Sequence, residues 1–186
     1  MRIISGDFRG RRLQGPDSAK IRPTSDRVRE AVFSMIAPYV AQARVLDLFA
    51  GSGALGLEAL SRGAAYCCFV DNGAEALRLL RANIDLCGAR DRSRLLQATA
   101  PSALRLLESQ NEYFDLVFLD PPYGKGLVEK VLEILGPVVG ADALVIAERH
   151  VKDLKEPIST PAWQTDRERR YGDTMISIYL RPSISG

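Results

Sequence analysis

Residues 45–56 read VLDLFAGSGALG, a short apolar run followed by a glycine-rich turn and the start of an amphipathic segment. Gly51, Gly53 and Gly56 fit the pattern G-x-G-x-x-G, and Asp71 lies 20 residues beyond Gly51, at the end of the next apolar run. This order of strand, glycine turn, helix and acid is typical of α/β domains that bind a nucleoside at the carboxyl end of a parallel sheet. The stretch therefore predicts such a domain, with the turn at its ligand site.

The chain beyond this stretch alternates between apolar runs and amphipathic segments. We expect strands at five apolar runs: 44–48, 65–70, 93–97, 114–119 and 143–147. We expect helices at the amphipathic segments between them: 53–62, 73–87, 101–109 and 126–135. Continuous apolar strands separated by helices indicate a parallel sheet that is covered on both faces.

The C-terminal part departs from this alternation. Residues 163–171 and 174–181 read as two strands joined by a tight turn at Gly172-Asp173, with no helix between them. We therefore predict an α/β, Rossmann-like domain at 26–186, with a seven-stranded, mostly parallel sheet that ends in an antiparallel hairpin. A helix is expected to open this domain at Asp26.

Residues 1–25 form a predicted basic extension, with a hairpin between residues 2–4 and 10–13. Residues 1–29 carry eight Lys or Arg against three Asp, a net charge of +5, whereas the whole chain carries +2. A basic segment attached to a mildly acidic body favours docking of a polyanion, although a solvated arginine-rich face has the same composition. The candidate contacts to a nucleic-acid backbone are Arg9, Arg11, Arg12, Arg22 and Arg27.

Composition disfavours several other classes of protein. No run approaches the roughly 18 apolar residues that span a bilayer, and the start of the chain lacks the apolar core of a signal peptide. The three cysteines, Cys67, Cys68 and Cys87, cannot all pair with one another and lack the spacing of metal ligands. We therefore expect no metal, no membrane partner and a location in the cytoplasm.

The glycine turn alone does not identify its ligand, because it also fits a nicotinamide dehydrogenase or a tight turn that binds nothing. Asp47 lies four residues before Gly51, where its charge would repel a pyrophosphate and attract a cation. S-adenosylmethionine has no phosphate and carries an ammonium and a sulfonium. We therefore predict this cofactor, with Asp71 accepting hydrogen bonds from the ribose hydroxyls and Phe49 or Asn72 beside the adenosine.

The tetrapeptide Asp120-Pro121-Pro122-Tyr123 follows the apolar run 114–119 directly. An exocyclic amine on a base is a poor nucleophile, because its lone pair is delocalised into the ring. The carboxylate of Asp120 and the carbonyl of Pro121 can each accept one N–H and favour a pyramidal nitrogen, while the prolines keep these acceptors rigid. Tyr123 offers a face on which an extruded base can stack. The tetrapeptide predicts methyl transfer to a base amine.

At this point the sequence resembles the RsmD family of bacterial 16S ribosomal RNA guanine-N2 methyltransferases. The resemblance covers nearly the whole chain and is carried by RIISGDFRGRRL, RPTSDRVREAVFSMI, DLFAGSGALGLEALSRGA, FLDPPY and YGDTMISIYLR. The glycine turn and DPPY are shared with adenine methyltransferases, so the N-terminal blocks carry the family assignment.

The resemblance implies the class I methyltransferase fold and one guanine of small-subunit RNA as target, on an assembling or assembled 30S subunit. It assigns Asp47, Gly51, Gly53 and Asp71 to the cofactor, and Asp120 to Tyr123 to the amine. The loop after the third strand, residues 96–100, lacks the acid that often holds the adenine amino group, so Gln97, Thr99, Ala100 or backbone groups of this loop are the candidates. We expect a monomer.

Two other functions stay open from the residues alone. DPPY does not read which base enters, so an adenine-N6 methyltransferase acting on DNA or RNA is the alternative enzyme. A nucleic-acid-binding module that has lost catalysis is the alternative outside enzymes. We interpret His150 as an ordinary loop residue, Glu148 as a solvated or capping acid, and the arginines of 167–170 as an exposed strand face.

Overall fold

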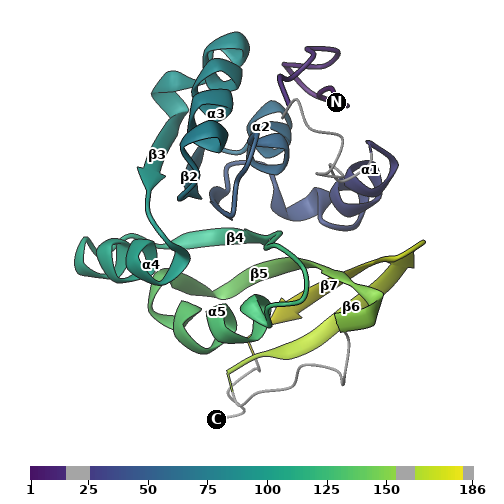
Figure 1. Cartoon of the computed structure of the whole chain (residues 1–186), viewed down its shortest axis with the longest axis vertical. Helices are drawn as coiled ribbons and strands as arrows, with labels where there is room; N and C mark the ends of the chain where they lie inside the picture. Colours follow the sequence, from purple (N-terminus) through teal and green to yellow (C-terminus); the bar gives the residue numbers. More distant parts are fainter. Residues whose placement is uncertain (16–25, 154–161, 182–186) are drawn as a thin grey trace.

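The fold is an α/β domain with one seven-stranded sheet, as expected from the sequence (Figure 1). It was established from a computed structural model, which describes residues 1–15, 26–153 and 162–181. The strands run in the order β3-β2-β1-β4-β5-β7-β6. Their bounds are β1 Arg44–Leu48, β2 Tyr66–Asp71, β3 Ser93–Gln97, β4 Phe114–Leu119, β5 Val139–His150, β6 Gln164–Tyr171 and β7 Thr174–Leu180.

Five strands are parallel and the C-terminal hairpin is antiparallel. β7 pairs antiparallel with β5 and with β6, and Tyr171 faces Thr174 across the two-residue turn at Gly172-Asp173. Gly172 has φ of 61°, the left-handed conformation that such a turn requires and that glycine adopts without strain. The predicted hairpin is therefore confirmed. The sheet shows the arrangement of class I S-adenosylmethionine-dependent methyltransferases.

Five α-helices of the described residues cover the two faces of the sheet. They are α1 Asp26–Met35, α2 Ala54–Ser61, α3 Ala74–Cys87, α4 Ala100–Ser109 and α5 Leu127–Leu135. Helices α1, α2 and α3 contribute to one buried apolar cluster, and α4 and α5 contribute to the other. Figure 1 shows these two groups on opposite sides of the sheet. After α1, Pro38 lies in a 3₁₀ turn at Ala37–Tyr39, consistent with the expected end of that helix.

The N-terminal residues form the expected hairpin, reduced to a single antiparallel bridge between Arg2 and Arg12. The amide of Ile3 donates to the carbonyl of Arg11 at 3.0 Å, and the amide of Gly10 donates to Ile3 at 2.9 Å. Ile3, Phe8 and Leu13 are buried in the same cluster as α1, α2 and α3. The hairpin therefore shares the core of the domain.

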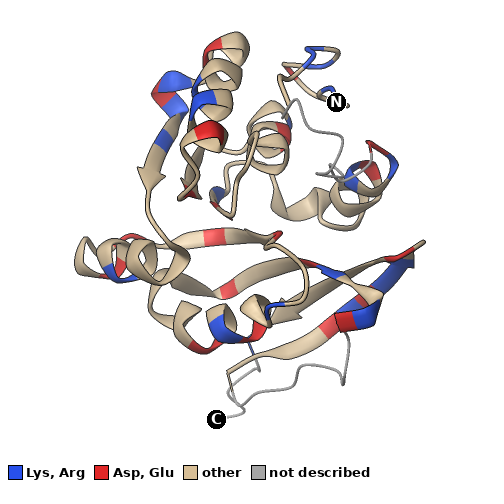
Figure 2. Ribbon diagram, viewed as in Figure 1, with Lys and Arg blue, Asp and Glu red and all other residues tan. Residues whose placement is uncertain are grey.

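Charged residues occur along the helices, in the N-terminal hairpin and along β6 and the turn that follows it (Figure 2). Among the described residues, no helix is long and apolar enough to cross a bilayer. The same residues contain no group of three or more His, Cys, Asp or Glu that could hold a metal ion. All three cysteines are free and buried.

Candidate active site

The glycine turn connects β1 to α2. Phe49, Gly51 and Gly53 all have positive φ, 68°, 55° and 82° respectively, and Gly53 caps the N-terminus of α2. A Cβ added at Gly51 would meet nothing within 4 Å, so there is open space beside the turn at this position. Glycine is favoured there because of its positive φ, which other residues rarely adopt. A Cβ at Gly56 would lie 2.3 Å from the ring of Phe69 in β2. Gly56 thus lets α2 pack closely on the sheet.

Asp71 ends β2, and its carboxylate joins two loops at the carboxyl edge of the sheet. One oxygen accepts from the amide of Gly51 at 2.8 Å, and the other accepts from the amide of Gly73 at 2.8 Å. The side chain is only partly buried. These bonds fix the carboxylate beside the glycine turn, where it can accept further hydrogen bonds from a ligand.

Asp47 lies in β1 behind the same turn and is almost completely buried. Its carboxylate accepts from the amide of Gly56 at 3.0 Å. Burial raises the pKa of Asp47 from 3.8 to about 7, the hydrogen bond from Gly56 lowers it, and the charge of Asp71 raises it. Its negative charge therefore costs free energy in the absence of a neighbouring cation.

The remaining predicted cofactor residues lie in the loops after β2 and β3. Asn72 is exposed directly after β2, and the amide of Ala98 donates to the carbonyl of Asp71 at 3.1 Å, which joins the two loops. Thr99 caps α4 and bonds the hydroxyl of Ser102 at 3.0 Å. Ala100 is buried as the first residue of α4. The side chain of Thr99 is therefore already engaged within its own helix.

The DPPY loop lies next to the glycine turn. Leu48 of β1 and Leu119 of β4 are paired in the parallel register, so the loops that follow these strands leave the sheet side by side. The chain continues from β1 to one side of the sheet and from β4 to the other, which makes this the topological switch point where α/β domains bind ligands. Pro121 is buried, whereas Pro122 and Tyr123 are exposed.

A cavity of about 490 Å³ opens beside this loop, lined by Pro121, Tyr123 and Glu148 among other residues. The hydroxyl of Tyr123 donates to Glu148 at 2.9 Å. Its ring packs edge-on against that of His150, with centroids 5.3 Å apart. Partial burial raises the pKa of Tyr123, and the charges of Glu148 and Asp120 raise it further.

Glu148 and His150 correct two of our interpretations. We expected β5 to end at 147, with a solvated acid and a loop histidine after it, but β5 continues to His150 and Glu148 is only 7% exposed. Both residues contact Tyr123. The apolar run ends at Ala147, so the run alone did not indicate that the strand continues to His150. The alternation Leu144, Ile146, Glu148, His150 on one face was the available signal.

The predicted nucleic-acid contacts divide between the hairpin and α1. Arg9, Arg11 and Arg12 are exposed on the hairpin and Arg27 is exposed on α1, whereas Arg22 lies outside the described residues. Arg11 donates to the carbonyl of Leu86 at 2.8 Å and stacks on the ring of Phe8. Part of its function is therefore to hold the hairpin on α3.

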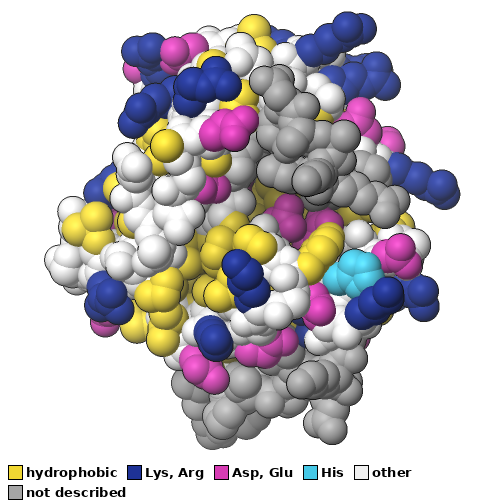
Figure 3. Space-filling view, in the orientation of Figure 1, with side chains coloured by type: hydrophobic (Ala, Val, Ile, Leu, Met, Phe, Trp, Pro, Cys, Tyr) yellow, Lys and Arg dark blue, Asp and Glu magenta, His cyan; other side chains and the backbone are white. Residues whose placement is uncertain are grey.

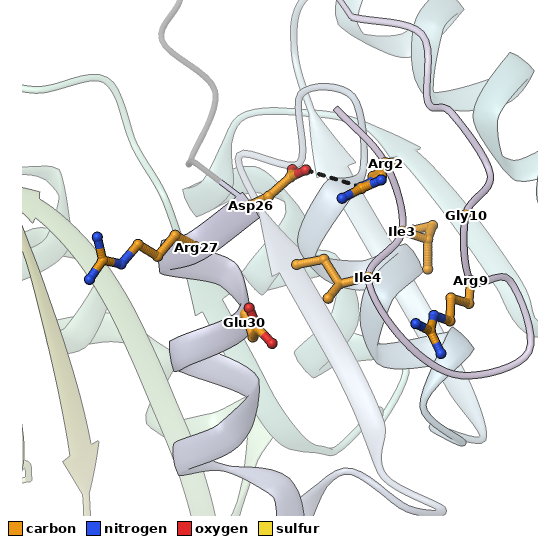
Figure 4. Close-up of a pocket in the computed structure, with 8 residues that line it drawn as sticks. All are labelled: Arg2, Ile3, Ile4, Arg9, Gly10, Asp26, Arg27 and Glu30. Carbon is orange, nitrogen blue, oxygen red and sulfur yellow. Dashed lines mark ion pairs between the residues drawn. The ribbon is translucent and has the colours of Figure 1, made fainter.

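A second cavity, of about 390 Å³, lies between the hairpin and α1. Figure 4 shows Arg2 facing Asp26 across it, at 3.7 Å, with Arg9 on the hairpin side and Arg27 directed away on the far side of the helix. Arg9 and Arg27 therefore lie on opposite sides of this cavity, and the acidic residues Asp26 and Glu30 also line it.

Buried polar side chains anchor the hairpin to the domain. Glu58 is fully buried in α2 and accepts from the amides of Ile4 at 2.8 Å and Ser5 at 3.0 Å. Asn83 of α3 is also fully buried, and its amide donates to the carbonyls of Gln14 at 2.9 Å and Ser52 at 2.8 Å. Asn83 therefore links the end of the hairpin to the glycine turn.

Comparison with known proteins gives a consistent family. A model of the family described as "Conserved hypothetical protein 95" matches residues 1–180. The chain is 37% identical over 183 residues to ribosomal RNA small subunit methyltransferase D of Escherichia coli K12, covering 97% of this chain and 90% of that protein. It is 35% identical over 183 residues to the protein of the same name from Haemophilus influenzae, covering 96% and 93%.

Solved structures agree with this likeness. The "Putative methyltransferase yhhF from Escherichia coli" superposes with a TM-score of 0.84 at 36% identity, covering 98% of both chains. SMU.776, "a putative methyltransferase complexed with SAH", has a TM-score of 0.66 at 15% identity, covering 86% of this chain and 50% of that one. The second likeness shows only that the fold is shared.

Proposed function

Because this chain belongs to the RsmD family of ribosomal RNA small subunit methyltransferases, we propose that it transfers a methyl group from S-adenosylmethionine to the N2 amine of a guanine in small-subunit ribosomal RNA. One observation carries the proposal. The glycine turn after β1 and the DPPY loop after β4 leave the sheet side by side, so a nucleoside-binding turn and an amine-binding loop meet at one place. The relatives named above supply the class of RNA.

The residues around the glycine turn fit this cofactor. The carboxylate of Asp71 is fixed by two amides and suits the two ribose hydroxyls. The buried charge of Asp47 behind the turn favours a cationic ligand over a pyrophosphate. When bound, S-adenosylmethionine supplies an electrophilic methyl group on a sulfonium. Asn72 and Thr99 lie in the adjoining loops and Ala100 begins α4, on the side where the adenosine would extend.

The DPPY loop holds and activates the amine. The carboxylate of Asp120 and the carbonyl of Pro121 each accept one N–H, which localises the nitrogen lone pair for attack. After methylation the nitrogen carries an excess proton, which the carboxylate of Asp120 can accept. Tyr123 is 45% exposed, so its ring offers a stacking face for an extruded base.

Docking of the RNA relies on the basic surface of the hairpin and α1. Arg9 and Arg12 are exposed on a hairpin that shares the domain core, and Arg27 is exposed on the far side of α1. We propose that Arg11 and Arg22 also contact the RNA. Such a compact patch suits recognition of a folded RNA by its shape and phosphates, within the small subunit. We place the enzyme in the cytoplasm as a monomer.

The test uses cells that lack this gene. Nucleosides from their purified small subunits should have lost N2-methylguanine at one nucleotide, which sequencing of RNA fragments by mass spectrometry locates. A plasmid copy of the wild type should restore it, and Asp120→Ala should not, although that variant should bind cofactor normally. Asp142→Ala, at an exposed acid of β5, is the matched control and should restore it. Loss of N6-methyladenine instead would favour the adenine alternative.

A further inference from the structure

The cavity beside the DPPY loop contains a second carboxylate that the amine chemistry does not use. Leu119 of β4 and Ala147 of β5 are paired, so the next residues, Asp120 and Glu148, are neighbours at the carboxyl edge. Phe118 and Ile146, two residues earlier on the same strands, are both buried in the cluster beneath α1, α2 and α3. Since side chains alternate along a strand, Glu148 faces the same side of the sheet as Ile146. Asp120 is the first residue after β4 and follows Phe118 at the same interval.

Glu148 is held in place. It is only 7% exposed, and its Oε1 accepts the hydroxyl of Tyr123 at 2.9 Å. Tyr123 in turn packs against His150. In Figure 3 the only histidine, drawn in cyan, lies beside acidic and hydrophobic side chains on the viewed face. A carboxylate has about four lone-pair positions and the hydroxyl of Tyr123 uses one of them, so Glu148 can accept from a ligand beside its partners within the protein.

Bases with an exocyclic amine differ at the ring position next to it. In guanine, N1 carries a hydrogen and donates beside the N2 amine. In adenine N1, and in cytosine N3, the corresponding nitrogen has a lone pair and accepts. A carboxylate beside the amine-binding group would therefore bind guanine and repel the other two bases, which supplies both an attractive and a repulsive element of specificity.

We propose that Glu148 is the specificity-determining residue, accepting the N1–H of the target guanine while Asp120 and Pro121 hold its N2 amine. This inference rests on the proposed function and adds to it the group that selects the base. Tyr123 then both stacks on the base and orients Glu148 through its hydroxyl. Neither the glycine turn nor the DPPY loop provides such discrimination.

The test compares guanine with 2-aminopurine, which keeps the 2-amine but has an unprotonated N1. Short RNAs carry one or the other at the nucleotide located in the deletion strain. The wild type should methylate guanine with a kcat/KM at least about 100-fold higher than that for 2-aminopurine. With 2-aminopurine, the carboxylate of Glu148 loses the N1–H donor and faces the lone pair of N1 instead. Glu148→Gln keeps an oxygen for Tyr123 and gains an N–H that can donate to N1. The guanine preference of this variant should therefore shrink to less than about 10-fold.

The outcomes separate the two proposals. If the wild type methylates no guanine in any RNA, the proposed function itself is wrong. If it methylates guanine but accepts 2-aminopurine equally well, or if Glu148→Gln keeps the full preference, the assignment of Glu148 is overturned. A residue that only holds Tyr123 would change overall activity and leave the ratio of the two substrates unchanged. Glu133→Gln, at an exposed acid of α5, is the control for the chemical change. Cofactor titration confirms that each variant is folded.

Discussion

Asp71 ends β2 and Asp47 is the penultimate residue of β1, so both lie near the glycine turn, yet their surroundings differ. Asp71 is partly exposed and accepts two backbone amides, whereas Asp47 is buried and accepts one. The spacing of both acids was visible in the sequence. The sequence did not show how deeply Asp47 is buried, because burial depends on the packing of α2 over β1.

Replacing Asp71 tests the cofactor site. Asp71→Ala should weaken S-adenosylmethionine binding by about 1.5–3 kcal/mol, since the ribose hydroxyls lose a charged acceptor. Asp71→Asn, which keeps one acceptor oxygen, should lose less. Calorimetric titration measures both, with Asp91→Ala at an exposed acid as the control. Equal affinity of Asp71→Ala and the wild type would remove Asp71 from the site.

Replacing Asp47 tests the effect of its burial on stability. Its pKa of about 7 in the folded protein, against 3.8 ordinarily, means that the native state retains a proton that the unfolded chain releases. The resulting stabilisation is complete below about pH 4 and is lost as the pH rises through 7. The stability of Asp47→Asn relative to the wild type should therefore rise between about pH 4 and pH 7 and stay constant above pH 7. Urea unfolding without cofactor measures this gain, and a difference independent of pH would contradict the burial argument.

Elements were predicted best where apolar runs were uninterrupted. The seven strands and the C-terminal hairpin follow from alternation of runs and turns, but β5 was predicted at 143–147 and extends over Val139–His150. The pairing of β5 with β4 shifts register between Phe114 and Leu116. The β5 residues opposite this shift, 140–143, are glycine, alanine or aspartate. Such a segment has no apolar pattern of its own. The N-terminal part of β5 is prolonged by its pairing with β4, which the sequence pattern does not reveal.

The close packing of α2 on β2 can be tested at Gly56. Gly56→Ala would place a Cβ 2.3 Å from the ring of Phe69 and 2.6 Å from the sulfur of Cys67, both fully buried. Overpacking of this kind should destabilise the protein by about 1–3 kcal/mol in urea unfolding. Phe69→Leu makes room, so the double variant should be more stable than the sum of the two single effects implies. If the two changes in unfolding free energy are strictly additive, contact with the ring of Phe69 is not the reason for glycine at position 56.

At the scale of the whole molecule, one apolar core joins the basic hairpin to the glycine turn. Positive charge in the first 29 residues was evident from composition. The anchoring by Glu58 and Asn83 was not, because both are polar residues in the middle of helical patterns that gave no sign of their partners. The structure thus connects the proposed RNA surface rigidly to the proposed catalytic edge.

Charge reversal tests this surface. Arg9→Glu with Arg12→Glu should weaken RNA binding and make its dependence on salt less steep, since fewer counterions are released, while cofactor affinity stays unchanged. Arg11 is left intact because it holds α3. Arg105→Glu with Lys130→Glu, at exposed residues of α4 and α5, makes the same change in charge on the opposite face. An equal salt slope in both double variants would make the hairpin arginines a solvated face.

The central claim is the identity of the product. Purified protein is incubated with methyl-labelled S-adenosylmethionine and equal amounts of small-subunit RNA and DNA from cells that lack the gene, and the digested nucleosides are separated by mass spectrometry. We predict label in N2-methylguanine from RNA, and none there with Asp120→Ala. Label in N6-methyladenine, or more label in DNA than in RNA, would contradict the account.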